Sequence, residues 1–156
     1  MYVSHLKIGS TKIGLGLFTD IKLPANQPLI EAVGTFYKKN ELQNSNNDDY
    51  ILQVGVDSFI DISGNLRHIN HSCNPNCLFH IVGNRIILYS MFAIKANSEL
   101  TFDYSSTSTD SLDEWQMDCR CGEYNCRKVI TGFQFLHSSI QKNMIFKEMI
   151  PLYLKK

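Results

Sequence analysis

Short apolar runs separated by turn residues recur along the chain, and they predict strands rather than helices. Leu6 and Ile8 flank Lys7 in the alternation typical of a half-buried strand. Further strands are expected at residues 13–18, 28–33, 50–54, 59–62, 77–82, 85–93 and 100–104. The pattern therefore predicts a compact, mostly β domain.

Helical signals are confined to two places. Ser63 is expected to cap a short turn over residues 64–69, which leads the chain to Asn70. Near the C-terminus, Pro151 closes a segment with near-helical spacing of apolar residues. These residues are Ile140, Met144, Ile145 and Met149. We predict one C-terminal helix that packs on the body of the domain.

Glycine and asparagine mark several turns. Gly14 and Gly16 interrupt a strand pattern, which indicates a bulge or a close approach of backbone. Because this pair lacks the third glycine and the following helix of a dinucleotide-binding fingerprint, a tight hairpin is the favoured interpretation. Asn26 and Asn97 occupy matching turns in which a left-handed residue is useful. A second hairpin is predicted at Gly83-Asn84.

Two polar segments interrupt the strand pattern. Residues 38–49 are rich in asparagine and have no hydrophobic periodicity, so they predict a surface insertion. Residues 105–113 are rich in serine, threonine and aspartate, and they predict a linker after the last strand.

Length and charge narrow the possible functions. The chain has 156 residues, enough for one domain with a real core. Its 15 Lys and Arg residues balance 15 Asp and Glu residues, so no global field favours nucleic acid or a membrane surface. No stretch has the length of a membrane span or the form of a secretory signal. We therefore expect a soluble intracellular protein, cytoplasmic or nuclear.

A cysteine cluster near the C-terminus predicts a metal site. Cys119, Cys121 and Cys126 lie within eight positions, and an odd total of five cysteines argues against a disulfide framework. Zinc takes four tetrahedral ligands, so a fourth must come from a distant segment. The candidates are Cys73, Cys77, His71, His80 and His137. A four-thiolate site is closed and therefore structural; the alternative is a set of inert buried cysteines.

The segment Asn70-His71-Ser72-Cys73 places an amide, an imidazole, a hydroxyl and a thiol in consecutive positions. This concentration of polar groups before the Asn74-Pro75-Asn76 turn is costly to bury unless the groups bind something. We interpret it as a ligand-binding turn.

Three separated segments, residues 14–18, 64–73 and 99–104, resemble the ordered motifs of the SET-domain protein lysine methyltransferases. The cysteine cluster resembles their post-SET zinc loop. The resemblance implies a SET domain over residues 4–105, a linker and zinc loop over 106–132, and a C-terminal helical tail over 133–156. It also implies a mostly β, β-clip-like fold of small sheets, with a knot-like crossing between the Asn-His-Ser-Cys segment and the Phe-Asp-Tyr strand.

The resemblance further implies S-adenosylmethionine as methyl donor and a protein or peptide lysine, such as a histone lysine, as acceptor. The implied cofactor-binding residues are Gly14, Gly16, Leu17, Asn70, His71, Tyr104 and Val129, with contacts through the backbone at Gly16 and Leu17. The implied catalytic residues are Tyr104, Tyr50 and Phe102. Cys73 would complete a structural zinc site with Cys119, Cys121 and Cys126. Phenylalanine at position 102 implies capacity for di- or trimethylation. No membrane or direct nucleic-acid partner is expected.

Several alternatives stay open at this point. The sequence is equally consistent with His71 as a core or capping residue and with His71 as a cofactor contact. For Phe102 the alternative role is that of a plain core residue. Arg67 and Glu99 are candidates for a supporting ion pair. The chain has no cysteines before Cys73, and the insertion at residues 38–49 is short, so the substrate is undetermined. A catalytically inactive, zinc-stabilised peptide-binding module of the same fold is the competing function.

Overall fold

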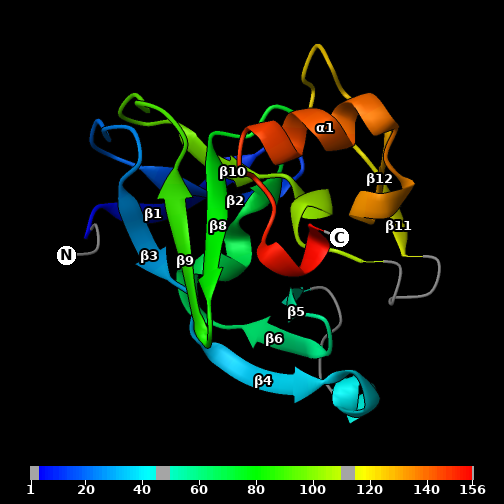
Figure 1. Cartoon of the computed structure of the whole chain (residues 1–156). Helices are drawn as coiled ribbons and strands as arrows, with labels where there is room; N and C mark the ends of the chain where they lie inside the picture. Colours follow the sequence, from blue (N-terminus) through cyan, green and yellow to red (C-terminus); the bar gives the residue numbers. More distant parts are fainter. Residues whose placement is uncertain (1–3, 45–49, 110–114, 156) are drawn as a thin grey trace.

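The computed structural model describes residues 4–44, 50–109 and 115–155, and this part of the chain is built mainly from short strands (Figure 1). The strands form four small sheets. The last residues of the polar insertion (45–49) and the last of the linker (110–113) lie outside the described residues. Residues 39–44 of the insertion form a 3₁₀ helix, Lys39–Asn44.

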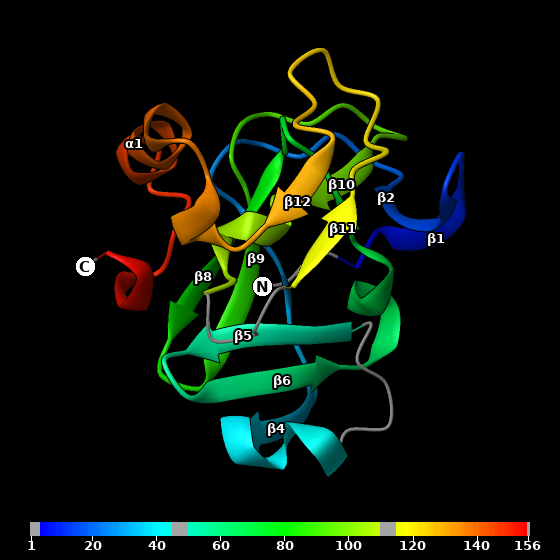
Figure 2. The same cartoon turned by 90° about the vertical axis from the view of Figure 1, so that its right-hand side faces the viewer.

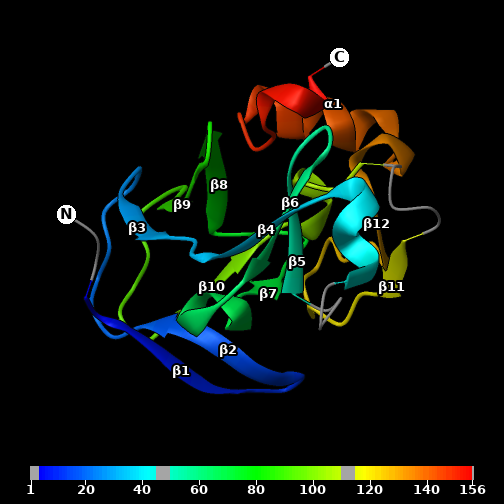
Figure 3. The ribbon, with the colours of Figure 1, turned by 90° about the horizontal axis from the view of Figure 1, so that it is seen from below.

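The first sheet carries the candidate site. Its order is β1 (Leu6–Thr11), β2 (Gly14–Thr19), β10 (Glu99–Phe102) and β7 (Asn70–His71). β1 and β2 form the predicted hairpin, with Thr11 opposite Gly14. β7 pairs with β10 in parallel, which places His71 beside Phe102 (Figure 3). The contact expected of the knot-like crossing is therefore present.

Two three-stranded sheets complete the body. One is ordered β3 (Pro28–Glu31), β9 (Arg85–Ser90), β8 (Cys77–Val82), and the other β4 (Gly34–Lys38), β6 (Ser58–Ile62), β5 (Ile51–Gly55). The Gly83-Asn84 hairpin is confirmed, with Val82 opposite Arg85. The expected strand at residues 28–33 ends early, at Glu31, and the chain then enters β4.

The matching asparagine turns are also confirmed. Asn26 has φ 57° and Asn97 has φ 60°, both in the left-handed region that asparagine tolerates better than most residues. A β-bridge joins Leu23 to Ile94, so the two turns lie together.

One hydrophobic core joins the three larger sheets. Leu17 and Leu100 from the first sheet, Leu88 from the second and Ile60 from the third are all fully buried in the same cluster. Burial of apolar area at about 25 cal/mol per Å² makes this cluster the main stabilising element. The short 3₁₀ turn Gly64–His68 contributes buried Leu66. Ser63 occupies the predicted N-cap position, but its side chain makes no capping hydrogen bond, because its hydroxyl donates to Val33 O at 3.0 Å instead.

The cysteine-rich segment forms a separate layer. β11 (Gln116–Asp118) and β12 (Val129–Thr131) pair antiparallel, and the connection between them carries Cys119, Cys121 and Cys126. Figure 2 shows this hairpin in yellow and orange. Buried Ile130 and Cys119 pack with Cys73, so this layer is joined to the first sheet through the cysteines.

The C-terminal helix is shorter than the apolar spacing predicts. α1 (Ser138–Phe146) follows the 3₁₀ turn Phe133–Phe135, and a further turn, Leu152–Leu154, comes after it. Met149 lies beyond α1, where its N–H donates to Met144 O at 2.9 Å. Glu148 has φ 54°, so the helix ends in a left-handed residue well before Pro151. Met144 and Met149 still pack together as core.

Glu148→Gly is expected to raise the free energy of unfolding by about 1 kcal/mol. A left-handed conformation strains a residue that has a Cβ atom, and glycine removes this strain. Urea unfolding of the two chains measures the difference. Glu148→Ala, which keeps the Cβ atom, is the control and should differ from the wild type by less than about 0.5 kcal/mol. A stability gain with alanine equal to that with glycine would contradict the explanation.

The tail also fixes the start of the predicted linker. Tyr153 lies with its hydroxyl 2.7 Å from Thr107 O and 2.9 Å from Gln53 O, between the linker and β5. Ser105, Ser106 and Thr107 are buried. The described first part of the linker is therefore packed against the body. In the described ranges, no helix is both long enough and apolar enough to cross a membrane.

Candidate functional site

A cavity of about 410 Å³ lies between the β1–β2 hairpin, β7 and the cysteine-rich layer. Asn70 and His71 on β7 and Tyr104 after β10 line it. The remaining lining residues are Ile13, Met117, Asp118, Arg120, Cys121 and Ile130. Segments from three distant parts of the sequence therefore enclose one space. A second, larger cavity of about 640 Å³ lies between α1 and the β8–β9 hairpin.

Asn70 fixes the hairpin against the rest of the site. Its amide Nδ2 donates to Leu15 O at 2.9 Å and to Glu99 Oε1 at 2.7 Å. A Cβ atom at Gly16 would come within 2.6 Å of Glu99 Oε1, so only glycine allows this approach. The close approach predicted at this glycine pair is therefore present at Gly16, where side chains make it, whereas Gly14 has φ 129° and open space around it.

Tyr104 lies in a turn, not on the last strand as predicted. β10 ends at Phe102, and the 3₁₀ turn Tyr104–Ser106 begins because the Asp103 side chain accepts from Ser105 N at 3.0 Å. The Tyr104 hydroxyl donates to Ile69 O at 2.8 Å. Burial, then the Glu99 carboxylate, raises the pKa of Tyr104 to about 12, so the phenol is protonated at neutral pH.

The other two aromatic candidates lie at different depths. Phe102 is 5% exposed and contacts Phe79 edge-on at 4.8 Å and Tyr104 at 4.9 Å between ring centroids. Tyr50 is partly buried, and the Arg67 guanidinium lies 4.0 Å from its ring centroid. The expected ion pair between Arg67 and Glu99 is wrong: the structure gives these two side chains other partners.

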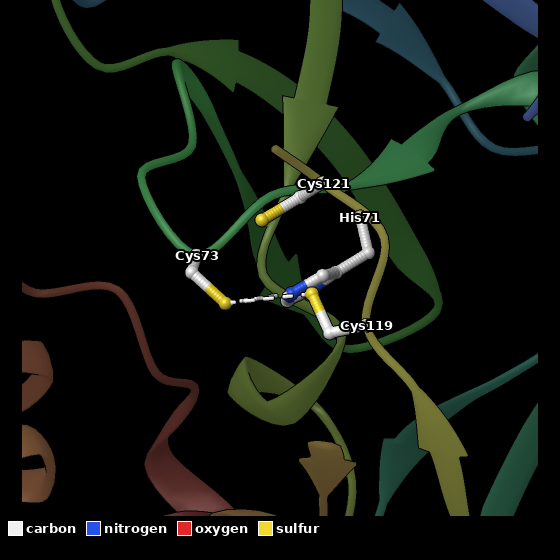
Figure 4. Close-up of side chains that lie close together, drawn as sticks. All are labelled: His71, Cys73, Cys119 and Cys121. Carbon is white, nitrogen blue, oxygen red and sulfur yellow. Dashed lines mark hydrogen bonds between the residues drawn. The ribbon is translucent and has the colours of Figure 1, made fainter. Parts of the chain in front are cut away.

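Thiols and one imidazole gather at the back of the cavity. The ligand atoms of His71, Cys73, Cys119 and Cys121 all lie within 4.8 Å of one another. Figure 4 shows these four side chains. The Cys73 and Cys119 sulfurs are 3.7 Å apart. Two sulfurs in a tetrahedral site with Zn–S of ~2.3 Å lie ~3.8 Å apart, so this pair already has the spacing of zinc ligands.

Cys126 lies next to this group without being one of its four members. Its sulfur is 3.8 Å from Cys119 O, and Lys128 N donates to it at 3.4 Å. Its thiol also interacts with those of Cys119 and Cys121. Five donor groups therefore surround a site that needs four.

The thiols differ in acidity. Burial raises the pKa of Cys73 to about 11 and also raises that of Cys119. Burial opposes ionisation of Cys121 as well, but hydrogen bonds from the backbone at Cys73 and Glu123 and from the other thiols lower its pKa to about 7. Burial lowers the pKa of His71 to about 4, so this imidazole is neutral at pH 7. A metal ion that displaces the thiol protons fits these groups.

Three of the candidates for the fourth ligand lie elsewhere. Cys77 is fully buried in the main core on β8. His80 stacks on Tyr89, with ring centroids 4.5 Å apart. His137 caps α1 by accepting from Ser139 N. Of the distant candidates, only Cys73 and His71 reach the cysteine-rich layer.

A buried ion pair also joins this layer to Tyr104. Arg127 Nη1 and Nη2 donate to the two carboxylate oxygens of Asp103, each at 2.7 Å. The Asp103 side chain is 2% exposed and that of Arg127 is 11% exposed. Arg127 follows the last cysteine of the cluster and Asp103 precedes Tyr104, so the pair connects the cysteine-rich layer to the turn.

A family model described as SET domain matches residues 14–105, more than half of the sequence. The chain belongs to the SET-domain family. The matched residues include β2, the Asn-His-Ser-Cys segment and Tyr104. The resemblance stated from the sequence is therefore confirmed.

Relatives of this SET domain are much longer proteins. Histone-lysine N-methyltransferase 2D of Homo sapiens is 35% identical over 130 residues, which cover 74% of this chain and 2% of that protein. Histone-lysine N-methyltransferase, H3 lysine-36 specific, of Chaetomium globosum is 34% identical over 146 residues, covering 84% and 16%. A solved structure of KRYPTONITE with mCHH DNA, an H3(1-15) peptide and SAH is 28% identical, with a TM-score of 0.66 over 81% of this chain and 29% of that one.

The SET domain brings only some of the predicted cofactor residues into the cavity. Asn70, His71 and Tyr104 line it. Leu17 is fully buried in the core, so its side chain does not reach the cavity, and the role of its backbone stays a prediction. Gly14, Gly16 and Val129 are not among the lining residues, although Val129 pairs with Asp118, which is one.

Several lining residues of the SET domain were not predicted. Ile13 lies in the hairpin turn, and Met117, Asp118 and Arg120 lie on β11 or just after it. Asp103 and Arg127 were also missed. The available signal was sequence adjacency, because Arg120 and Arg127 each neighbour a cysteine of the cluster and Asp103 precedes Tyr104.

Proposed function

We propose that this chain is a catalytic SET domain that transfers methyl groups from S-adenosylmethionine to the ε-amine of a protein lysine. The observation that carries the proposal is the cavity in which Asn70, His71 and Tyr104 meet at the metal-binding layer. The relatives named as histone-lysine methyltransferases and the SAH-bound solved structure support it. We assign residues 4–105 to the SET domain, 106–132 to the linker and zinc loop, and 133–156 to the tail.

The cavity has groups suited to both ends of this cofactor. S-adenosylmethionine supplies an electrophilic methyl group on a sulfonium, and it carries an amino acid end and an adenosyl end. The charges of Arg120 and Asp118 complement the carboxylate and the ammonium of the amino acid end. Ile13, Met117 and Ile130 offer apolar surface to the adenosyl end. Backbone at Gly16 and Leu17 and the side chain of Val129 complete the proposed contacts.

Tyr104 orients the amine. Because its hydroxyl donates its proton to Ile69 O, the lone pairs of the hydroxyl oxygen stay available. They can accept from the amine or from a C–H group of the transferred methyl. A free lysine has a pKa near ~10.4, so the site must favour the neutral amine, and an aromatic channel does this by desolvation. Tyr50 and Phe102 form the proposed walls, and Tyr50 would also accept a methylated ammonium on its ring face.

We assign Cys73, Cys119, Cys121 and Cys126 to one structural zinc ion. The 3.7 Å spacing of Cys73 and Cys119 and the position of Cys126 against Cys119 support a four-thiolate set. Such a site is closed to substrate, so zinc would hold the β11–β12 layer over the cavity and take no part in the transfer.

Tyr104→Phe is expected to lower kcat by about 100-fold or more, because it removes one preorganised polar group beside the transferred methyl. Transfer of labelled methyl from S-adenosylmethionine to histones and to whole-cell extract measures the loss. Tyr124→Phe is the matched control, since Tyr124 is fully exposed in the zinc loop, and its activity should equal that of the wild type. Cofactor binding without transfer to any protein would support the inactive peptide-binding module instead.

A histone tail is the proposed acceptor. The relatives are named for histone lysines, and the H3-bound solved structure supports a peptide laid against this fold. A histone acceptor would place the protein in the nucleus, and another protein acceptor would allow a cytoplasmic site of action. We propose no direct nucleic-acid contact for this chain, because its charges balance.

Phe102→Tyr is expected to reduce the product from di- or trimethyl-lysine to monomethyl-lysine. A hydroxyl beside Tyr104 would hold water in the space that a methylated amine needs to rotate. Mass spectrometry of a peptide substrate at equal extents of reaction measures the product states. Phe79→Tyr is the matched control, because Phe79 contacts Phe102 from the core side, and it should leave the product ratio unchanged. Monomethylation alone by the wild type would contradict the assignment.

A further inference from the structure

The His71 side chain lies between the metal-binding thiols and the turn that carries Tyr104. It is 5% exposed and sits on β7, opposite Phe102. The imidazole Nδ1 is 3.1 Å from Tyr104 N, and Nε2 is 3.3 Å from the Cys73 sulfur (Figure 4). The two ring nitrogens therefore face two different parts of the site.

The hydrogen bond from Tyr104 fixes the tautomer of this ring. A backbone N–H can only donate, so Nδ1 must accept and carries a lone pair. In the neutral imidazole the proton then resides on Nε2, which faces the Cys73 sulfur. The Nε2–H group donates to sulfur and has no lone pair for a metal ion. Of the five donor groups, this leaves the four cysteines as the ligand set.

We infer that His71 is a positioning residue that couples the Cys73 ligand to the backbone of Tyr104. This inference rests on the proposed function. Cys73 sulfur receives N–H groups from His71 at 3.3 Å and from Arg127 at 3.4 Å, and both stabilise the thiolate. At the other side, Tyr104 is held at its N–H by His71 and at its hydroxyl by Ile69 O. One ring therefore fixes a zinc ligand and the reacting tyrosine together.

Two substitutions separate the two hydrogen bonds. In His71→Asn the side-chain oxygen takes the place of Nδ1 and accepts from Tyr104, while the Cys73 sulfur loses its donor. In His71→Gln the longer amide places an N–H near the position of Nε2, while Tyr104 N loses its acceptor. The pair tests the coupling without removing all polar contact at position 71.

We expect opposite patterns from the two variants. His71→Asn should release metal to a chelator about tenfold faster and shift the thiolate-to-cobalt absorption of the Co²⁺-substituted protein, and any fall in its kcat should be smaller than that of His71→Gln. His71→Gln should lower kcat about tenfold at nearly constant KM, with metal release and the cobalt spectrum unchanged. Equal losses of both properties in both variants, or no change in either, would overturn the inference and leave His71 a packing residue.

A measurement on the unmodified protein covers the case in which a variant fails to fold. The ¹⁵N NMR spectrum of the zinc-loaded wild type should show His71 with a protonated Nε2 and an unprotonated Nδ1. A proton on Nδ1, or metal coordination through Nε2, would overturn the inference that His71 couples Cys73 to Tyr104. Neither this spectrum nor the cobalt spectrum depends on methyl transfer. A failure of the proposed function can therefore be distinguished from a failure of the inferred coupling through His71.

Discussion

Cys119→Ala is expected to abolish stoichiometric zinc binding and to raise the Kd for S-adenosylmethionine at least tenfold. Cys119 is buried and its sulfur lies 3.7 Å from that of Cys73, so its loss should separate the proposed zinc loop from the first sheet. Structural zinc contributes ~10–16 kcal/mol to the folding of small zinc-binding peptides, and the proposed zinc ion would hold the β11–β12 layer by the same kind of bond. Asp118, Arg120 and Cys121 line the cavity from this layer, so the cofactor loses a wall when the layer is released.

Cys77→Ala is the matched control for this experiment. Cys77 is also buried but lies in the main core, so the variant should lose some packing and keep one zinc per chain. Metal analysis of freshly purified reduced protein and calorimetric titration with S-adenosylmethionine measure the two quantities. Full zinc content in Cys119→Ala, or unchanged cofactor affinity after zinc loss, would show that the thiol layer and the cavity are independent.

Arg127→Met is expected to lower the free energy of unfolding by about 3–5 kcal/mol, because it leaves the Asp103 carboxylate buried without its partner. The substitution should also disturb the turn that carries Tyr104. Asp103 caps the turn that begins at Tyr104, and a carboxylate that turns toward water no longer holds that turn. Methyl transfer should therefore fall together with stability.

Arg120→Met provides the comparison for Arg127. Arg120 lies in the same loop but is exposed, so its removal should change the free energy of unfolding by less than about 0.5 kcal/mol. Urea unfolding of the three zinc-loaded proteins measures the differences. If the two variants were equally stable, the ion pair would be dispensable. The double variant Asp103→Asn with Arg127→Met should recover part of the loss, since no charge is then left unpaired.

The elements that follow from local pattern were predictable from the sequence. The β1–β2 and β8–β9 hairpins need only alternating residues and turn-forming glycine or asparagine at Gly14 and Gly83-Asn84. The left-handed turns at Asn26 and Asn97 were likewise predictable, because asparagine tolerates this conformation better than most residues. The cysteine spacing indicated a metal layer, and Cys73 was correctly placed against it.

Features that depend on distant partners were not predictable in this way. Tyr104 lies in a turn because the Asp103 side chain caps it, and Asp103 is itself fixed by Arg127 from 24 positions later. The end of α1 depends on Glu148, a residue with no intrinsic preference for the left-handed region. Charge pairs of this kind leave no periodic signal, so only the three-dimensional arrangement identifies them.

The parallel pairing of β7 with β10 determines when the site can form during folding. Asn70 meets Glu99 across 29 positions, and Cys73 meets Cys119 across 46. Forming contacts at such separations costs the entropy of closing long loops, whereas the two hairpins close short loops and form early. A chain that has formed every local element still lacks the cavity, the tyrosine turn and the thiol cluster. The proposed cofactor site is therefore a property of the fully folded chain, and we expect partly folded intermediates to be unable to bind the methyl donor.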